Sequence, residues 1–130
     1  MESITYSFPV KVPSLNEYIN ACRRNKYAGG KMKKDLSEAI RSFLPSQPKM
    51  TLTPPFDLHF VFYEQTKRRD KDNVISMGVK GTLDSFQEHG ILGNDNWLWI
   101  ETIKADVLLA KDCIKEPYRF DVTITERRKK

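Results

Sequence analysis

Alternating hydrophobic and polar positions predict four strands along the chain. Apolar side chains recur at every second position in residues 4–12, which is the period of a strand with one buried face. The same period runs through residues 56–64, and a cleaner alternation runs through residues 118–125. Residues 97–109 are interpreted as the remaining strand.

Two stretches with helical periodicity separate these strands. In residues 31–44 the apolar side chains fall on one side of a helix, and prolines end the pattern. Residues 72–89 fit a second helix, with Gly90 as the glycine that ends it. Gly78 and Gly81 are expected to weaken this helix by roughly 1 kcal/mol each.

The resulting order, β-α-β-α-β-β, predicts an α+β domain in which a small mixed sheet has helices packed on one face. The pattern of residues 16–25 is short and ambiguous, and the glycines of Ala28-Gly29-Gly30 predict a break before the first helix. A chain of 130 residues is too short for two cores of ordinary size. Residues 1–126 are therefore predicted to form one domain, followed by a basic tail at residues 127–130.

Composition argues against a disordered protein and against a membrane-spanning one. The chain is 39% hydrophobic and 11% aromatic, which is too rich for a disordered chain. No apolar run approaches the roughly 18 residues that cross a bilayer, and the first residues lack the layout of a signal peptide. Cys22 and Cys113 are not spaced as a disulfide framework or a zinc site. We therefore expect an intracellular protein with no membrane partner.

Basic residues are more informative by position than by number. The net charge is +5, but residues 127–130 supply four of these five charges. No acidic residue lies between Glu17 and Asp35, and a second basic cluster surrounds Asp70. The predicted DNA-contacting residues of the two clusters are Arg23, Arg24, Lys26, Lys31, Lys33, Lys34, Lys67, Arg68, Arg69 and Lys71. Such side chains hold a DNA backbone without reading bases; the alternative for the first cluster is a solvated face with a flexible loop.

Carboxylates follow the strand of residues 56–64. In extended backbone Asp70 and Asp72 project to the same side, and their mutual repulsion is relieved by a divalent cation. A third carboxylate, Asp95, lies in a polar turn before the strand of residues 97–109. If the two strands are neighbours, both turns could meet at one end of the sheet. The alternatives are a helix N-cap with a favourable first-turn charge for the pair and an ordinary turn around Asp95.

A family resemblance favours the metal site. The run Arg69-Asp70-Lys71-Asp72-Asn73, with Lys80, Leu83-Asp84, Gly90 and Asn94-Asp95 after it, resembles the RusA family of Holliday-junction resolvases. Chain length, the Pro13-Ser14-Leu15-Asn16 element and the closing run Thr123-Ile124-Thr125-Glu126 are also similar to the family, so the resemblance covers most of the chain.

The resemblance implies a homodimer that cuts four-way DNA junctions with magnesium, or manganese in its place. It assigns Asp70, Asp72 and Asp95 as metal ligands and catalytic carboxylates, and Lys80 as a catalytic lysine. Two departures stand out: Asn94 replaces a family aspartate, and an apparent four-residue insertion precedes Lys80. Four residues add roughly 6 Å of helix, so Lys80 keeps its place only if the extra turn unwinds. The alternative for Lys80 is an i,i+4 pair with Asp84.

Three functions are compatible with these observations. The first is a metal-dependent, structure-selective endonuclease that resolves Holliday junctions in recombination and repair. The second is a branched-DNA-binding protein of the same fold with impaired catalysis. The third is a small-molecule phosphohydrolase, which the basic segments disfavour. The family resemblance further implies a cytoplasmic protein of a bacterium or prophage.

Overall fold

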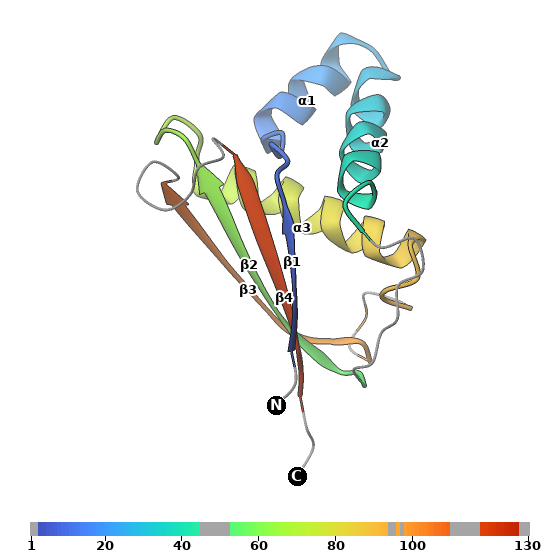
Figure 1. Ribbon diagram of the computed structural model, residues 1–130. Helices are drawn as coiled ribbons and strands as arrows, with labels where there is room; N and C mark the ends of the chain where they lie inside the picture. The colour runs from blue at the N-terminus through green and yellow to red at the C-terminus, as the bar shows by residue number, and fades with distance from the viewer. Residues whose placement is uncertain (1–2, 45–52, 94–95, 97, 110–117, 128–130) are drawn as a thin grey trace.

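The computed structural model describes residues 3–44, 53–93, 96, 98–109 and 118–127. Their strands and helices follow one another along the chain as in Figure 1. These elements are β1 (Ser3–Phe8), α1 (Leu15–Arg24), α2 (Ala28–Arg41), β2 (Phe56–Glu64), α3 (Lys71–Glu88), β3 (Ile100–Leu109) and β4 (Arg119–Glu126). The α+β class, the small mixed sheet and the four strands predicted from the sequence are confirmed.

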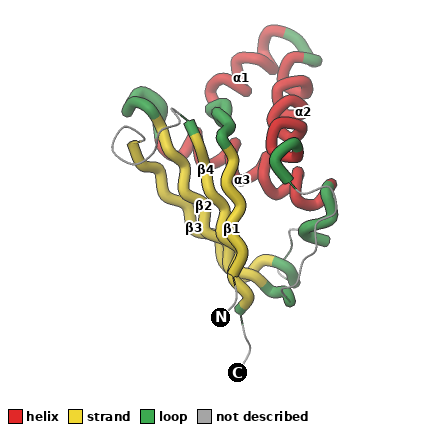
Figure 2. The backbone as a smooth tube through the Cα atoms, in the orientation of Figure 1, coloured by secondary structure: helices red, strands yellow, loops and turns green. Residues whose placement is uncertain are grey.

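The four strands form an open sheet in the order β1-β4-β2-β3, seen side by side in Figure 2. β4 is antiparallel to both β1 and β2, whereas β2 and β3 are parallel. Parallel neighbours need a long crossover connection, and α3 provides it between β2 and β3. The carboxyl ends of β2 and β3 therefore lie together at one end of the sheet.

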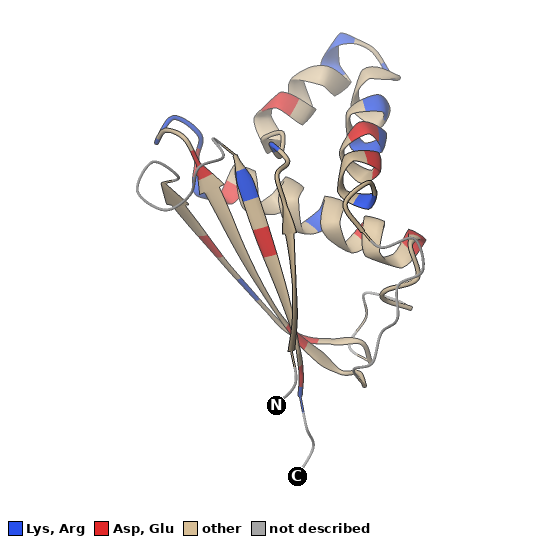
Figure 3. Ribbon diagram, viewed as in Figure 1, with Lys and Arg blue, Asp and Glu red and all other residues tan. Residues whose placement is uncertain are grey.

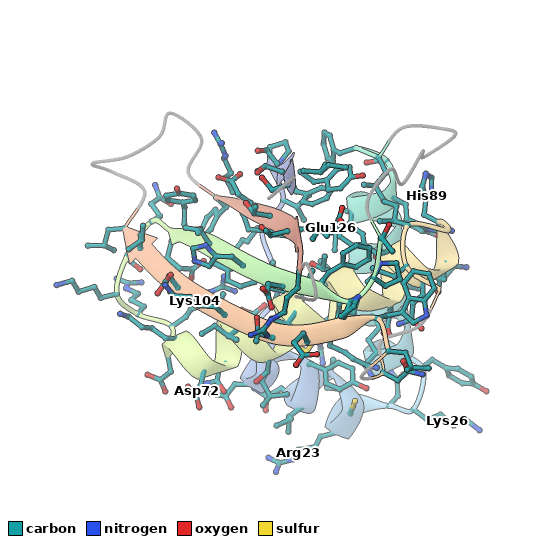
Figure 4. All side chains as sticks on the ribbon, turned by 90° about the horizontal axis from the view of Figure 1, so that it is seen from below. Arg23, Lys26, Asp72, His89, Lys104 and Glu126 are labelled. Atoms are coloured by element: carbon teal, nitrogen blue, oxygen red, sulfur yellow. The ribbon has the colours of Figure 1, made fainter. Side chains whose placement is uncertain are left out.

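The helices cover one face of this sheet, as predicted; in Figure 4 they lie beneath the strands. Alternate residues of β2 explain why, since Phe56, Leu58, Phe60 and Phe62 are all buried. Phe120 of β4 packs among them, with its ring centroid 5.3 Å from that of Phe62. Burying aromatic side chains of this size removes the largest apolar areas from water, so these rings dominate the core that fixes β2 under the helices.

The helical region contains one helix more than predicted, so the order is β-α-α-β-α-β-β. α1 occupies the stretch whose pattern was ambiguous, and the Ser14 hydroxyl caps it by accepting a hydrogen bond from the Glu17 N–H at 3.1 Å. The predicted break at Ala28-Gly29-Gly30 is wrong, because these residues form the first turn of α2. Gly29 lies against Cys22, where a Cβ would collide with the sulfur. Glycine is therefore needed there for close packing of α1 on α2.

Gly78 and Gly30 offer a matched pair of glycine-to-alanine substitutions. A Cβ at Gly78 would collide with the Phe62 ring, which is buried, whereas a Cβ at Gly30 meets nothing within 4 Å. We expect Gly78→Ala to lower the free energy of unfolding by about 1–2 kcal/mol, because overpacking outweighs the gain in helix propensity. Gly30→Ala should raise it by about 0.5–1 kcal/mol. Urea denaturation of both variants measures this contrast; equal effects would contradict the packing of α3 on β2.

Candidate metal and nucleic-acid site

Asp70 and Asp72 lie where the chain enters α3. Asp70 is the N-cap residue, with φ −68° and ψ 140°, and Asp72 is in the first helical turn. The predicted extended backbone therefore holds for Asp70 and is wrong for Asp72. The N-cap alternative is confirmed in the position of Asp70 and in the first-turn charge of Asp72, but the Asp70 side chain makes no capping hydrogen bond. Both side chains are exposed and form no hydrogen bond or ion pair with another described residue.

The surroundings of these carboxylates are electropositive. Lys67, Arg68 and Lys71 are exposed beside them, and Figure 3 shows this basic loop at the end of β2. The first N–H groups of α3 add the partial positive charge of a helix N-terminus. The basic side chains of Lys67, Arg68 and Lys71 form no ion pair with another described residue, so they can bind an anion such as a phosphate.

A cavity of about 400 Å³ opens at this point. Its walls come from the loop after β2, including Asp70 and Lys71, and from Val107, Leu108 and Leu109 at the end of β3. In sheets with parallel strands, ligands bind outside the carboxyl ends of those strands. This cavity, called the Asp70 cavity below, lies outside the carboxyl ends of the parallel strands β2 and β3.

Unlike its exposed basic neighbours, Arg69 is partly buried and is paired within the chain. Its guanidinium makes a bidentate pair with the Glu64 carboxylate, with Nε–Oε1 2.7 Å and Nη2–Oε2 2.8 Å. It also donates to the Val12 carbonyl and lies 3.3 Å from the Glu17 carboxylate. Only 15% of the Arg69 side chain and 8% of the Glu64 side chain are exposed. The hydrogen bonds that Arg69 donates to Glu64 raise the pKa of Arg69 above its ordinary value.

Arg69 is therefore a structural clamp, and its predicted contact with DNA stays a prediction. It joins the end of β2, the segment before α1 and α1 itself, and so fixes the loop that carries Asp70. The role of Glu64 could not be predicted from the sequence, because the buried Glu64–Arg69 pair joins residues five apart and this spacing matches neither the helix nor the strand period.

Lys80 is separated from the carboxylates. α3 is a continuous helix, so the eight residues from Asp72 to Lys80 correspond to about 12 Å along its axis. The Lys80 ammonium instead pairs with Asp84, with Nζ–Oδ1 3.2 Å. No turn of α3 is unwound, so the condition under which Lys80 would keep the position implied by the resemblance is not met, and the i,i+4 pair with Asp84 is confirmed.

Asp95 and Asn94 lie outside the described residues, so their predicted roles remain predictions. Their described neighbour Asn96 accepts a hydrogen bond from the Ile100 N–H at 2.9 Å. Ile100 pairs with Phe56, at the opposite end of β2 from Asp70. The eight steps along β2 correspond to about 26 Å. The prediction that the turn before β3 could meet the Asp70 loop at one end of the sheet is therefore not met within one chain.

The first basic cluster lies on α1 and α2, with Lys26 in the turn between them. All six side chains are exposed, so the alternative of a solvated face is confirmed, whereas most of the predicted loop is helix. Arg23 and Arg24 end α1, and Figure 4 shows Arg23 and Lys26 on the helical side of the molecule. Lys31 pairs with Asp35 at 3.0 Å. Lys34 and Lys33 also have partners: the Lys34 ammonium lies 4.0 Å from the Glu38 carboxylate, and the Lys33 ammonium lies 4.8 Å from the Tyr18 ring centroid. Exposed pairs of this kind are weak, so a phosphate can compete for these lysines.

Comparison with known proteins gave no match to any family model or curated protein. Among the described residues, no group of three or more His, Cys, Asp and Glu side chains could hold a metal ion. No helix in the described part of the chain is long and apolar enough to span a bilayer.

Proposed function

We propose that this protein is a metal-dependent endonuclease that resolves branched DNA, with Asp70 and Asp72 holding a magnesium ion, or manganese in its place. One observation carries the proposal. Two exposed carboxylates with no partner among the described residues lie at the start of α3, beside three exposed basic residues and a cavity at the carboxyl ends of parallel strands.

The donor set suits magnesium better than zinc or calcium. Magnesium keeps several waters and is bound through one or two carboxylates together with substrate phosphates. Zinc sites in proteins use nitrogen and sulfur ligands in a closed set, and calcium takes six to eight oxygens. Asp70 and Asp72 provide the two carboxylates. Because the turn before β3 lies at the other end of β2, Asp95 would be a third ligand only from a partner chain. When bound, the ion would activate water and stabilise charge on the phosphate.

The residues of the chain would position the DNA. Lys67, Arg68 and Lys71 would bind the phosphates next to the scissile one, because they lie beside the carboxylates in the chain, are exposed and form no ion pair with another described residue. The Glu64–Arg69 clamp would hold the loop in place while these contacts form. Arg23, Arg24 and the lysines of α2 would hold a second DNA segment. A homodimer fits this function, because a four-way junction must be cut on two strands related by a two-fold axis.

A second function has its own support. Lys80 lies about 12 Å beyond Asp72 along α3 and is paired with Asp84, so the lysine that the RusA resemblance places at the reaction is absent from this site. A branched-DNA-binding protein with impaired cleavage is therefore the alternative.

Incubation of the protein with a labelled mobile four-way junction and a matching linear duplex distinguishes these functions. We expect paired nicks in the junction alone, in Mg²⁺ or Mn²⁺ and not in EDTA. A junction that is bound but uncut in both metals supports the binding protein. A junction that is neither bound nor cut contradicts both functions.

A further inference from the structure

β3 is an edge strand with an unusual surface. It lies at the end of the sheet away from β1, and Figure 1 shows it as the outermost strand on that side. Its ten residues leave one side of the backbone without a partner strand among the described residues. An edge of this length is a template for pairing with another chain, and proteins normally protect it.

The side chains of β3 combine exposed charges, at Glu101 and Lys104, with exposed apolar groups. Ile103 is 48% exposed on the helix-covered face, and Leu108 is 45% exposed on the opposite face. Val107 and Leu109 are only half-buried. The other edge strand, β1, differs: its exposed residues are the polar Ser3, Thr5 and Ser7. The apolar exposure is therefore specific to the β3 edge.

The charges on β3 fit a second copy of the same strand. In an antiparallel pair centred on Ala105, Lys104 of each chain lies opposite Asp106 of the other, and Ile103 lies opposite Val107. Directly opposed residues share a face and interact. Centring the pair on Lys104 or on Asp106 instead places like charges face to face. Only the register centred on Ala105 combines two opposite-charge pairs with two apolar pairs.

We propose that two chains associate through their β3 edges, antiparallel about a two-fold axis at Ala105, to form one continuous eight-stranded sheet. Isologous pairing of this kind closes after two subunits and leaves β1 at each outer edge. The Asp106 carboxylate has a hydrogen bond with His59, Nε2–Oδ2 2.8 Å, which lowers the pKa of Asp106. The lowered pKa favours the negative charge that the pair with Lys104 requires. This interface would be the contact between the two subunits of the proposed homodimer. Its test needs neither DNA nor metal, so the interface proposal can fail while the nuclease proposal holds.

Sedimentation equilibrium of the full chain tests this interface. We expect a dimer of twice the 15.2 kDa chain mass. Lys104→Glu and Asp106→Lys should each weaken it about tenfold or more, because each creates two like-charge pairs. The double variant restores opposite charges and should recover most of the affinity. Glu101→Lys, on the same strand but opposite Leu109, is the matched control. A monomeric wild type, or single variants that dimerise like the control, would overturn the proposal.

Cross-linking gives a second readout that does not depend on charge. Ala105 faces itself across the axis, so Ala105→Cys, in a background of Cys22→Ser and Cys113→Ser, should oxidise to a disulfide-linked dimer. Thr102→Cys faces Leu108 in this register and should not. Equal cross-linking of both variants, or none at Ala105→Cys in a dimeric protein, rejects the register.

Discussion

Asp70→Asn and Asp72→Asn are each expected to slow junction cleavage by about 100-fold or more, with junction binding unchanged or slightly tighter. Asparagine keeps the size and the oxygen of the side chain but removes the negative charge that holds a divalent cation. Neither side chain has a hydrogen bond or ion pair with another described residue, so stability should change little. Single-turnover cleavage and a gel-shift titration of the same preparations separate the two effects.

Asp84→Asn is the matched control for these variants. Asp84 is on the same helix, α3, but is paired with Lys80 away from the Asp70 cavity. It should retain cleavage within a fewfold of wild type. Cleavage that survives in both Asp70→Asn and Asp72→Asn would remove the argument for a metal site at the start of α3.

Arg69→Met should produce the largest loss of stability among the charged residues, about 3–5 kcal/mol in the free energy of unfolding. Methionine preserves much of the apolar stem but leaves the Glu64 carboxylate, which is 8% exposed, without its bidentate partner. It also removes the donor to the Val12 carbonyl, so the segment before α1 loosens as well. Denaturation in urea at neutral pH gives the free energy directly.

Arg68→Met controls for the loss of a positive charge in the same loop. The side chain of Arg68 is exposed, so its replacement should change stability by no more than about 0.5 kcal/mol. Adding Glu64→Leu to Arg69→Met removes the unpaired carboxylate and should restore part of the loss. A destabilisation of Arg69→Met no greater than that of Arg68→Met would show that the clamp does not hold the loop.

The strands were predictable because burial on one face imposes its period on the sequence. β2 occupies the predicted residues, and its burial alternates as predicted, with the side chains from Phe56 to Phe62 buried at every second position. α3 also ends as expected, with Gly90 at φ +84° directly after the C-cap. Local chemistry determines these features, so a single sequence reveals them.

α1 and the start of α2 were missed for two different physical reasons. α1 is short and largely polar, and only Ala21 is buried within it; the signal that could have found it is Ser14 followed three residues later by Glu17, a capping box. At Gly29 the local preference of glycine is overridden by close packing on Cys22. The Gly29–Cys22 contact joins two helices, so the hydrophobic pattern of either helix alone does not predict it.

The residues of the site could be predicted from the sequence, but their arrangement in space could not. The sequence places Asp70 and Asp72 after a strand and before a helix, and the structure places Asp70 at the N-cap and Asp72 in the first turn of α3. The parallel pairing of β2 with β3, which places the turn before β3 at the far end of the sheet, depends on long-range contacts. The Glu64–Arg69 pair likewise depends on how the loop folds back.

Direct measurement of metal binding tests the central claim, that Asp70 and Asp72 hold a divalent cation. The protein is titrated with Mn²⁺ while free Mn²⁺ is followed by electron paramagnetic resonance. Saturable binding is expected in wild type and in Asp84→Asn, and its loss is expected in the Asp70→Asn/Asp72→Asn double variant. Equal Mn²⁺ binding in wild type and in the double variant would contradict the account.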